Sequence, residues 1–365
     1  MAEFYDPYMR AKMEDGTGMV WKSVDDTPFV LEGFYWRKTG GEFRRMPHCP
    51  LPPGVEAHAP QTAGGQLRFK TDSAKIMLRA AVRTRDNDAD IMTYGRIGFD
   101  IYCGAPGVAR YAGVTHINFD TVRSFAAEYC TTLFDAPAGR RRMREFTVNF
   151  PLYAQVDRLE IGFEPGAEFA APSPRVCERP IVWYGTSITQ GCCVSRPGMA
   201  ATNIVSRLLN RPVLNFGFAG SGKGEPVVAE TLAEIESPAM FLLDYDANTS
   251  EEELAATLPG FIGILRKRHP GTPVVTISRL PFPADFPFDP EDSFEENTRR
   301  RREIHRNNLF RLREAGDRNI HFIDGCSLYG EDFSECSSDN CHSSDLGFYR
   351  TAHALAPELR RILEA

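Results

Sequence analysis

The sequence contains no apolar run of about 18 residues, the length that a membrane-spanning helix needs, so we expect no membrane segment. The segment Met1–Arg10 carries Glu3 and Asp6 and lacks the apolar core of an export signal, which predicts a cytoplasmic protein. Export is the alternative if the amino terminus was processed or engineered. A basic excess is also missing, since the formal net charge is -7 at pH 7. This charge disfavours a nucleic acid as partner. Two arginine clusters are local, and the second, Arg299–Arg302, is interpreted as the solvated face of a helix.

Cysteines lack the spacing of a metal site. The nine cysteines are an odd number and include no Cys-x-x-Cys pair, which favours free thiols over disulfides. A zinc site at His342 would have to use three cysteines without that spacing, Cys326, Cys336 and Cys341. We therefore predict no metal site. Cys192 and Cys193 are interpreted as small buried thiols.

Short strands separated by turn residues occupy the first half of the chain. Leu67–Lys70 and Ile76–Arg83 flank Thr71-Asp72-Ser73, which we interpret as a hairpin connection. Further strands are predicted at Ile97–Tyr102, Phe146–Phe150 and Leu159–Phe163. This spacing predicts an all-β sandwich or jelly roll.

Proline and glycine are dense between Pro165 and Pro180, which marks a domain boundary. We expect a β domain over residues 1–175 and a second domain over residues 176–365.

Strands and helices alternate in the second half. Strands are predicted at Pro180–Tyr184, Val213–Phe216, Ala239–Leu243, Pro273–Ser278 and Ile320–Asp324. Helices are predicted at Met199–Leu209, Pro226–Ile235, Ser250–Arg268, Asn297–Glu314 and Ser344–Leu363. The alternation implies a parallel sheet with right-handed crossovers, hence a three-layer α/β/α domain. Ligands of such domains bind at the carboxyl ends of the strands.

A serine follows the first of these strands, within Gly185-Thr186-Ser187-Ile188-Thr189-Gln190-Gly191. The two glycines indicate a tight turn that presents Ser187 at the carboxyl end of the strand. This position makes Ser187 a candidate nucleophile. A turn former or a helix cap is the alternative.

Asp339-Asn340-Cys341-His342 near the end of the chain offers the groups that such a serine needs. A serine nucleophile requires a base, and the base requires a partner that fixes its tautomer. Residues three apart can share a face, so His342 is the candidate base and Asp339 its partner. The alternative is a capped turn with His342 on the surface.

Two further turns follow predicted strands. A glycine-rich turn holds Gly220, and Asp244–Asn248 ends in an amide. An oxyanion needs preorganised N–H donors, which the Gly220 backbone and the Asn248 side chain can supply. Phosphate binding is the alternative for the glycines, but Gly220–Gly224 does not satisfy the phosphate-loop pattern.

In this order, Ser187, Gly220, Asn248 and His342 resemble the four signature blocks of the SGNH (GDSL-type) hydrolases, over residues 176–365. The resemblance implies a Ser187–His342–Asp339 triad. It also implies an oxyanion hole made of the Ser187 and Gly220 N–H groups and the Asn248 amide. Two blocks depart from the family pattern: Thr186 replaces Asp in the first, and the third does not read Gly-x-Asn-Asp.

A longer stretch, Tyr184–Gly191 followed by Ser195–Met199, is similar to a bacterial subgroup of this family. That subgroup carries an amino-terminal β domain with a Gly-x-Asp-Leu-Tyr motif, which Gly98–Tyr102 matches with Ile for Leu. The resemblance implies a flavodoxin-like SGNH domain preceded by a β sandwich.

The activity that the resemblance implies is hydrolysis of short acyl esters, acetyl esters of carbohydrates above all, without a cofactor. A small-molecule or glycan ester is then the partner, and self-association is left open. Arg279, Tyr184 and Arg196 lie beside the motifs and are candidate substrate contacts, with a structural salt bridge as the alternative for Arg279. Two other functions are an acyltransferase that uses the same site and a carbohydrate-binding protein whose hydrolase half is inert.

Overall fold

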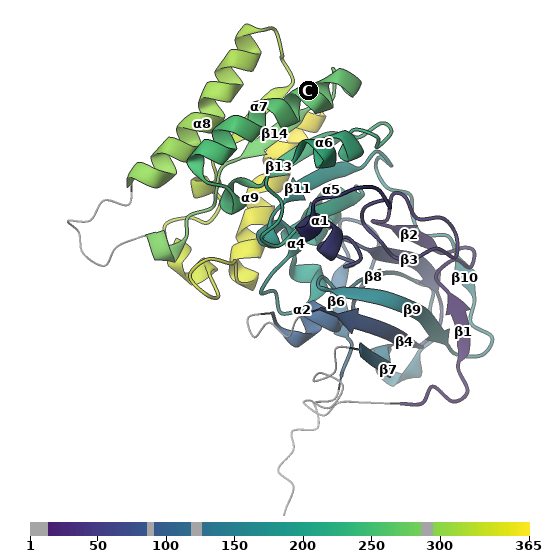
Figure 1. Ribbon diagram of the computed structural model, residues 1–365. Coiled ribbons are helices and arrows are strands. Elements are labelled where there is room, and N and C mark those ends of the chain that lie inside the picture. The colour runs from purple at the N-terminus through teal and green to yellow at the C-terminus, as the bar shows by residue number, and fades with distance from the viewer. Residues whose placement is uncertain (1–13, 86–90, 118–125, 286–294) are drawn as a thin grey trace, which may run out of the picture. The chain divides into compact units, whose positions relative to one another are not determined.

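The computed structural model of the chain describes residues 14–85, 91–117, 126–285 and 295–365 (Figure 1). The segment Met1–Arg10, which bears on the expected absence of an export signal, lies outside them. Two compact units form. The first takes in residues 1–44, 60–174 and 195–198, and the second takes in residues 45–59, 175–194 and 199–365. The units therefore divide between Pro174 and Arg175, and each also includes a short segment from the other side of that point.

The first unit is built from antiparallel strands. One sheet has the order β1-β9-β4-β7: β1 (Val20–Ser23), β9 (Ala154–Phe163), β4 (Lys75–Thr84) and β7 (Ala126–Asp135). The other has the order β10-β3-β8-β5-β6, with β2 paired to β3: β10 (Phe169–Ala170), β3 (Gln66–Thr71), β8 (Arg144–Asn149), β5 (Asp100–Cys103), β6 (Arg110–Val114) and β2 (Val30–Glu32). Short helices complete the unit: α2 (Thr93–Ile97) and η1 (Pro137–Gly139), a 3-10 helix.

Buried side chains from both sheets form one apolar cluster, as in a β sandwich. Strand β7 shows the reason, because buried residues alternate with more exposed ones along it. The predicted hairpin at Thr71-Asp72-Ser73 is wrong, since β3 and β4 belong to different sheets. The short link carries the chain from one layer of the sandwich to the other, so closeness in sequence does not produce pairing here.

The second unit holds a parallel sheet of order β12-β11-β13-β14-β15. Its strands are β11 (Ile181–Gly185), β12 (Val213–Gly217), β13 (Met240–Asp244), β14 (Val274–Ile277) and β15 (Ile320–Ile323). Every residue of β11 and β12 is buried, as expected for strands covered on both faces. The order is that of flavodoxin-like folds, and it confirms the predicted parallel sheet.

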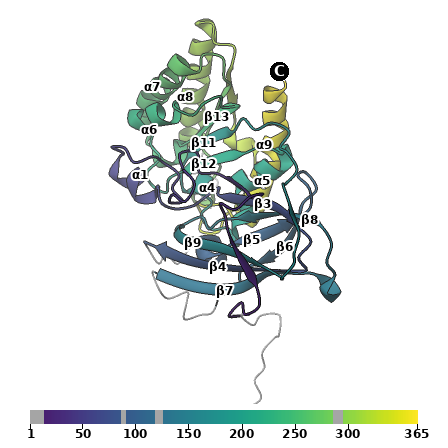
Figure 2. The same cartoon turned by 90° about the vertical axis from the view of Figure 1, so that its right-hand side faces the viewer.

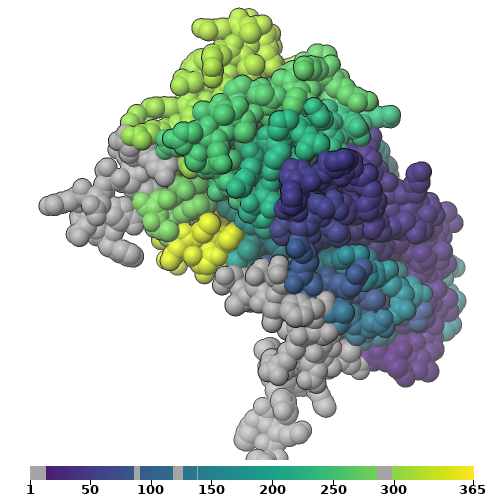
Figure 3. Space-filling view, in the orientation of Figure 1, coloured from purple at the N-terminus to yellow at the C-terminus, as the bar shows by residue number. Residues whose placement is uncertain are grey.

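Helices cover both faces of this sheet. They are α1 (Pro53–His58), α4 (Ser187–Gln190), α5 (Ala201–Leu209), α6 (Pro226–Leu232), α7 (Glu251–Arg268), α8 (Glu295–Glu314) and α9 (Asp345–Leu363). Figure 2 shows α6, α7 and α8 on one side of β11–β13, and α5 and α9 on the other. In the space-filling view, α7 and α8 form an exposed surface of this unit (Figure 3). Short 3-10 helices lie between these elements: η2 (Pro197–Met199), η3 (Asp246–Asn248), η4 (Pro283–Asp285), η5 (Gly325–Ser327) and η6 (Phe333–Cys336).

Within the described ranges, no helix combines the length and the apolar character needed to cross a membrane.

Candidate active site

Ser187 is the first residue of α4, and only Thr186 separates it from the buried strand β11. Thr186 caps this helix: its hydroxyl accepts the Ile188 N–H at 3.2 Å, while the Thr189 hydroxyl accepts the Thr186 N–H at 3.3 Å. Gly185 is required at the bend, because a Cβ there would lie 2.0 Å from Thr189 Oγ1. The strand end and the capped turn together fix the backbone that carries the Ser187 hydroxyl.

The three predicted triad side chains meet. Ser187 Oγ lies 2.9 Å from His342 Nε2, and His342 Nδ1 lies 2.6 Å from Asp339 Oδ2. With Nδ1–H donated to the carboxylate, Nε2 is left to accept the Ser187 proton. The chain of three groups is therefore arranged to move a proton from a serine hydroxyl to an imidazole.

The turn that carries His342 holds the Asp339 carboxylate in place. The backbone N–H groups of His342 and Cys341 donate to Asp339 Oδ1 at 2.6 and 3.0 Å. Partial burial on its own would raise the pKa of Asp339, but the His342 ring and these N–H groups lower it below its ordinary value. The carboxylate is thus held in its charged form, the form that stabilises an imidazolium.

Backbone pairing fixes the other side of this turn. The His342 carbonyl accepts the Ser338 N–H at 2.9 Å and the Ser337 hydroxyl at 3.1 Å. Ser337 and Ser343 form an antiparallel bridge, and Ser344 then caps α9. A short loop between η6 and α9 therefore orients the imidazole without relying on a long flexible connection.

Gly220 lies in an exposed turn after β12, with a left-handed φ of +63°. Its N–H donates to no backbone acceptor in the part of the chain that the structure describes. The turn is tied to the nucleophile segment, because Phe218 N–H donates to the Gly185 carbonyl and Ala219 N–H donates to Gln190 Oε1. The Gly220 N–H is therefore available as an oxyanion donor.

Asn248 ends η3, after β13, and its side chain reaches the same turn. Its Nδ2 donates to the Phe218 carbonyl at 3.3 Å. A primary amide carries two N–H donors, so this contact leaves a second one. The structure thus brings the Asn248 side chain to the turn that holds Gly220, and the oxyanion role of both residues stays a prediction.

The 3-10 helix that ends at Asn248 begins with Asp246, a buried carboxylate that the sequence analysis missed. Asp246 accepts hydrogen bonds from the Arg301 guanidinium at 2.5 Å and from the Arg279 N–H at 2.8 Å, and it lies 3.4 Å from His305 Nε2. Burial alone would raise the pKa of Asp246, but His305 and Arg301 lower it. Arg301 also donates to the Asp246 and Thr249 carbonyls, so it clamps both ends of η3.

The prediction of a solvated face for Arg299–Arg302 is therefore wrong for Arg301, which is only 8% exposed. Arg301 is buried because the Asp246 carboxylate and two carbonyls satisfy its guanidinium.

Two of the predicted substrate contacts have structural partners. Tyr184 is fully buried and stacks on Phe261, and its hydroxyl donates to Glu225 and accepts the Gly224 N–H. This gives Tyr184 a packing role in place of the predicted contact. Arg279 forms an ion pair with Asp285, the salt bridge considered as its alternative.

Arg196 binds within the first unit, to the motif at Gly98–Tyr102. Its guanidinium donates to Asp100 Oδ2 at 2.8 Å and to the Tyr102 hydroxyl at 2.7 Å, and lies over the Tyr111 ring. The Gly198 N–H donates to the same carboxylate oxygen at 2.8 Å. This ion pair joins two motifs far apart in the sequence, and the substrate contact at Arg196 stays a prediction.

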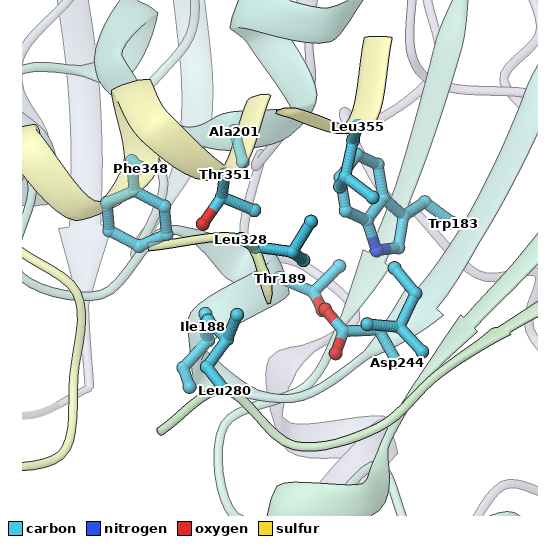
Figure 4. Close-up of a pocket in the computed structure, with 11 residues that line it drawn as sticks. Trp183, Ile188, Thr189, Ala201, Asp244, Leu280, Leu328, Phe348, Thr351 and Leu355 are labelled. Atoms are coloured by element: carbon cyan, nitrogen blue, oxygen red, sulfur yellow. The ribbon is translucent and has the colours of Figure 1, made fainter. Parts of the chain in front are cut away.

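A small, mostly apolar cavity lies beside α4, and Figure 4 shows the side chains around it. One carboxylate faces it: Asp244 accepts the Thr189 hydroxyl at 2.9 Å. Burial raises the pKa of Asp244 to about 7, and the hydrogen bond from Thr189 opposes this rise only in part. A carboxyl group that titrates near neutral pH therefore contacts Thr189, two residues after Ser187.

Comparison with protein families gives two matches. The GDSL-like lipase/acylhydrolase family model matches residues 178–360. A model of the amino-terminal domain of SGNH-hydrolase-type esterases, called GxDLY, matches residues 19–169. Among curated protein sequences, none matches this chain.

Several solved structures match over most of the chain. A protein described as a GDSL-like lipase from Bacteroides ovatus is 29% identical, with a TM-score of 0.83 over 95% of this chain and 98% of that one. The salicylyl-acyltransferase SsfX3 of a tetracycline biosynthetic pathway is 20% identical, with a TM-score of 0.71 over 95% and 98%. An acetyl xylan esterase from Butyrivibrio proteoclasticus is 11% identical, with a TM-score of 0.60 over 95% and 99%. The last two likenesses concern the fold.

Proposed function

Since this chain belongs to the GDSL-like lipase/acylhydrolase family, we propose that it is a serine esterase that removes short acyl groups, acetyl first, from carbohydrate esters. The observation that carries the proposal is the proton path from Ser187 Oγ to His342 Nε2 at 2.9 Å and from His342 Nδ1 to Asp339 at 2.6 Å. If Ser187 only capped a helix, or if His342 only lay on the surface, the three groups would not need to be aligned in this way.

In the first step, Ser187 Oγ attacks the ester carbonyl carbon while His342 Nε2 takes the hydroxyl proton. The carbonyl oxygen becomes an oxyanion, which accepts hydrogen bonds from the Ser187 and Gly220 N–H groups and the Asn248 amide. Asp339 stabilises the imidazolium, as its lowered pKa keeps it charged. His342 then gives the proton to the leaving alcohol, and an acyl-enzyme remains.

In the second step, water attacks the acyl-enzyme. His342 takes a proton from this water and returns it to Ser187 Oγ as the carboxylic acid leaves. The His342 side chain is 24% exposed, so water can reach the imidazole. In each half of the cycle, His342 gives up the proton that it has taken. The cycle therefore needs no cofactor.

The acetyl and carbohydrate parts of the proposal draw support from the acetyl xylan esterase and from a family-two carbohydrate esterase of Clostridium thermocellum with a TM-score of 0.55. The test is acetate release from a panel of acetylated sugars and from p-nitrophenyl acetate. Ser187→Ala should lose several orders of magnitude in turnover. Ser334→Ala, at an exposed serine in η6, serves as the matched control and should retain the wild-type rate.

Acetate release that Ser187→Ala retains would refute the serine mechanism. A series of p-nitrophenyl esters tests the acyl group, because a maximum at long chains would contradict the short-acyl assignment. If the folded wild type releases no acid from any ester, the esterase proposal fails and a binding role takes its place.

A second candidate is acyl transfer, which the fold of the salicylyl-acyltransferase favours. An acceptor alcohol would replace water in the second step, with the same residues in the same roles. Product analysis with and without added sugar or alcohol separates the two reactions. Transfer is the main activity if new ester accumulates at the expense of free acid.

A further inference from the structure

We propose that Cys192, Cys193 and His342 form a binding site for a thiophilic divalent cation such as Zn²⁺ or Cd²⁺, and that its occupation blocks the catalytic base. One ligand atom from each residue lies within 4.8 Å of the other two. The two Sγ atoms are 3.3 Å apart. Two sulfurs and one imidazole nitrogen are a usual donor set for zinc.

The distances are close to those of a tetrahedral metal centre. With Zn–S near 2.3 Å and Zn–N near 2.0–2.1 Å, ligand atoms around zinc lie about 3.5–3.8 Å apart. The two sulfurs must separate by roughly half an ångström, and the imidazole must approach by about 1.3 Å at most. Side-chain rotations of this size need no change of the sheet or of α4.

The imidazole is already oriented as metal-binding histidines are. Asp339 accepts the Nδ1–H of His342 at 2.6 Å, so the nitrogen left for a metal is Nε2. A carboxylate that holds the far side of a histidine in this way fixes the tautomer and raises the basicity of the ligand nitrogen. The arrangement that prepares His342 as a base therefore also prepares it as a ligand.

Charge balance favours a divalent ion in this setting. Cys192 and Cys193 are both buried, at 5% exposure each, so two thiolates there would be costly alone. Binding releases one proton from each thiol to solvent, and the two thiolates then neutralise the cation. The fourth position of the tetrahedron is open to water.

Occupation of this site stops the proton transfer. The Nε2 lone pair, which takes the Ser187 proton at 2.9 Å, is the lone pair that would bind the metal. The cation is thus an inhibitor of the proposed reaction. Only this inhibitory consequence rests on the proposed function, and binding itself does not.

Binding is tested directly with Cd²⁺, by the ultraviolet absorption of cadmium–thiolate bonds, on the full chain in a metal-free, reducing buffer. Wild type should bind one equivalent tightly. Cys192→Ser and His342→Ala should each weaken binding by more than about tenfold, because even indirect supports of a metal site typically contribute 10–100-fold. Ser187→Ala keeps all three ligands and should bind as wild type does. Cys103→Ser, at a half-buried thiol of the first unit, is the matched control and should also leave binding unchanged.

Unchanged affinity in folded Cys192→Ser, or an equal loss in Cys103→Ser, would overturn the site. Inhibition is tested with Zn²⁺ on p-nitrophenyl acetate hydrolysis, each variant being compared with its own metal-free rate. Wild type should lose activity and regain it with a chelator, and Cys192→Ser should resist. If the chain hydrolyses no ester, the Cd²⁺ measurement still decides the site, so the two proposals fail separately.

Discussion

Arg196 is expected to stabilise the first unit through its ion pair with Asp100, and replacing it by Met tests this. The Asp100 side chain is fully buried, and Arg196 is 18% exposed. Removing one partner of a buried pair leaves an uncompensated charge, which typically costs about 3–5 kcal/mol. Asp100 keeps two other donors, the Gly198 N–H and the Asn149 amide. We therefore expect the low end of this range, about 3 kcal/mol in the free energy of unfolding.

An exposed arginine–aspartate pair in the same unit is the matched control. Arg83 contacts Asp157 with two hydrogen bonds of 2.6 and 2.8 Å, but the two side chains are 57% and 34% exposed. Solvent screens such a pair, so Arg83→Met should cost at most about 1 kcal/mol. The two variants make the same chemical change and differ in burial.

Thermal unfolding in a Trp183→Phe background provides the assay. The fluorescence then comes from Trp21 and Trp36, both in the first unit, because the chain has three tryptophans. For a unit of this size, 1 kcal/mol shifts the melting temperature by about 2–4 °C, so Arg196→Met should lower it by roughly 6–12 °C. A shift no larger than that of Arg83→Met would refute the reasoning. Asp100→Asn in combination with Arg196→Met should recover part of the loss, because the double variant leaves no buried charge.

Three further results are expected. Asp339→Asn should reduce kcat for p-nitrophenyl acetate by about 10⁴ without loss of folding, since the imidazolium loses its carboxylate; a loss below tenfold would contradict the triad. Asn248→Ala should reduce kcat by roughly 10²–10³ with little change in KM, and an effect on KM alone would exclude an oxyanion role. Because the pKa of Asp244 is raised to about 7 from 3.8, the folded chain binds more protons than the unfolded one between these values, so stability should fall as pH rises through this window. Asp244→Asn, which keeps an acceptor for Thr189, should flatten the dependence of melting temperature on pH, and an unchanged slope would refute the assignment.

Local signals predicted the parts of the site that lie at strand ends. The glycines around Ser187 and the apolar strand before it define a turn whose position follows from the sheet. The Asp339–His342 spacing likewise specifies a local geometry, because both residues share one short loop. Such features need only neighbours in the sequence, so the pattern of residues was sufficient to find them.

Contacts between distant segments were beyond the same reasoning. Both Gly98–Tyr102 and Ser195–Met199 were singled out as motifs, yet nothing in either indicates that Arg196 pairs with Asp100. Arg45 is similar: it is fully buried, and its guanidinium donates to the Asn215 and Gly217 carbonyls of β12. Contacts of this kind, between a guanidinium and backbone carbonyls of a distant strand, leave no mark in the sequence, because every residue carries a carbonyl.

Helix α8 shows why the hydropathy pattern did not reveal the residues that hold Asn248 in place. Its buried face is polar, with spacing of three, four and three residues: Thr298, Arg301, His305 and Asn308. This spacing is helical, but apolar periodicity cannot detect it because the four buried residues that the structure describes in this helix are all polar. A buried ion pair is often no more stable than apolar packing, so stability alone does not explain the pairing of Arg301 with Asp246. Its geometry does: Arg301 holds the two ends of η3, the turn that presents the Asn248 amide. The polar face of α8 therefore fixes the position of Asn248, a candidate oxyanion donor.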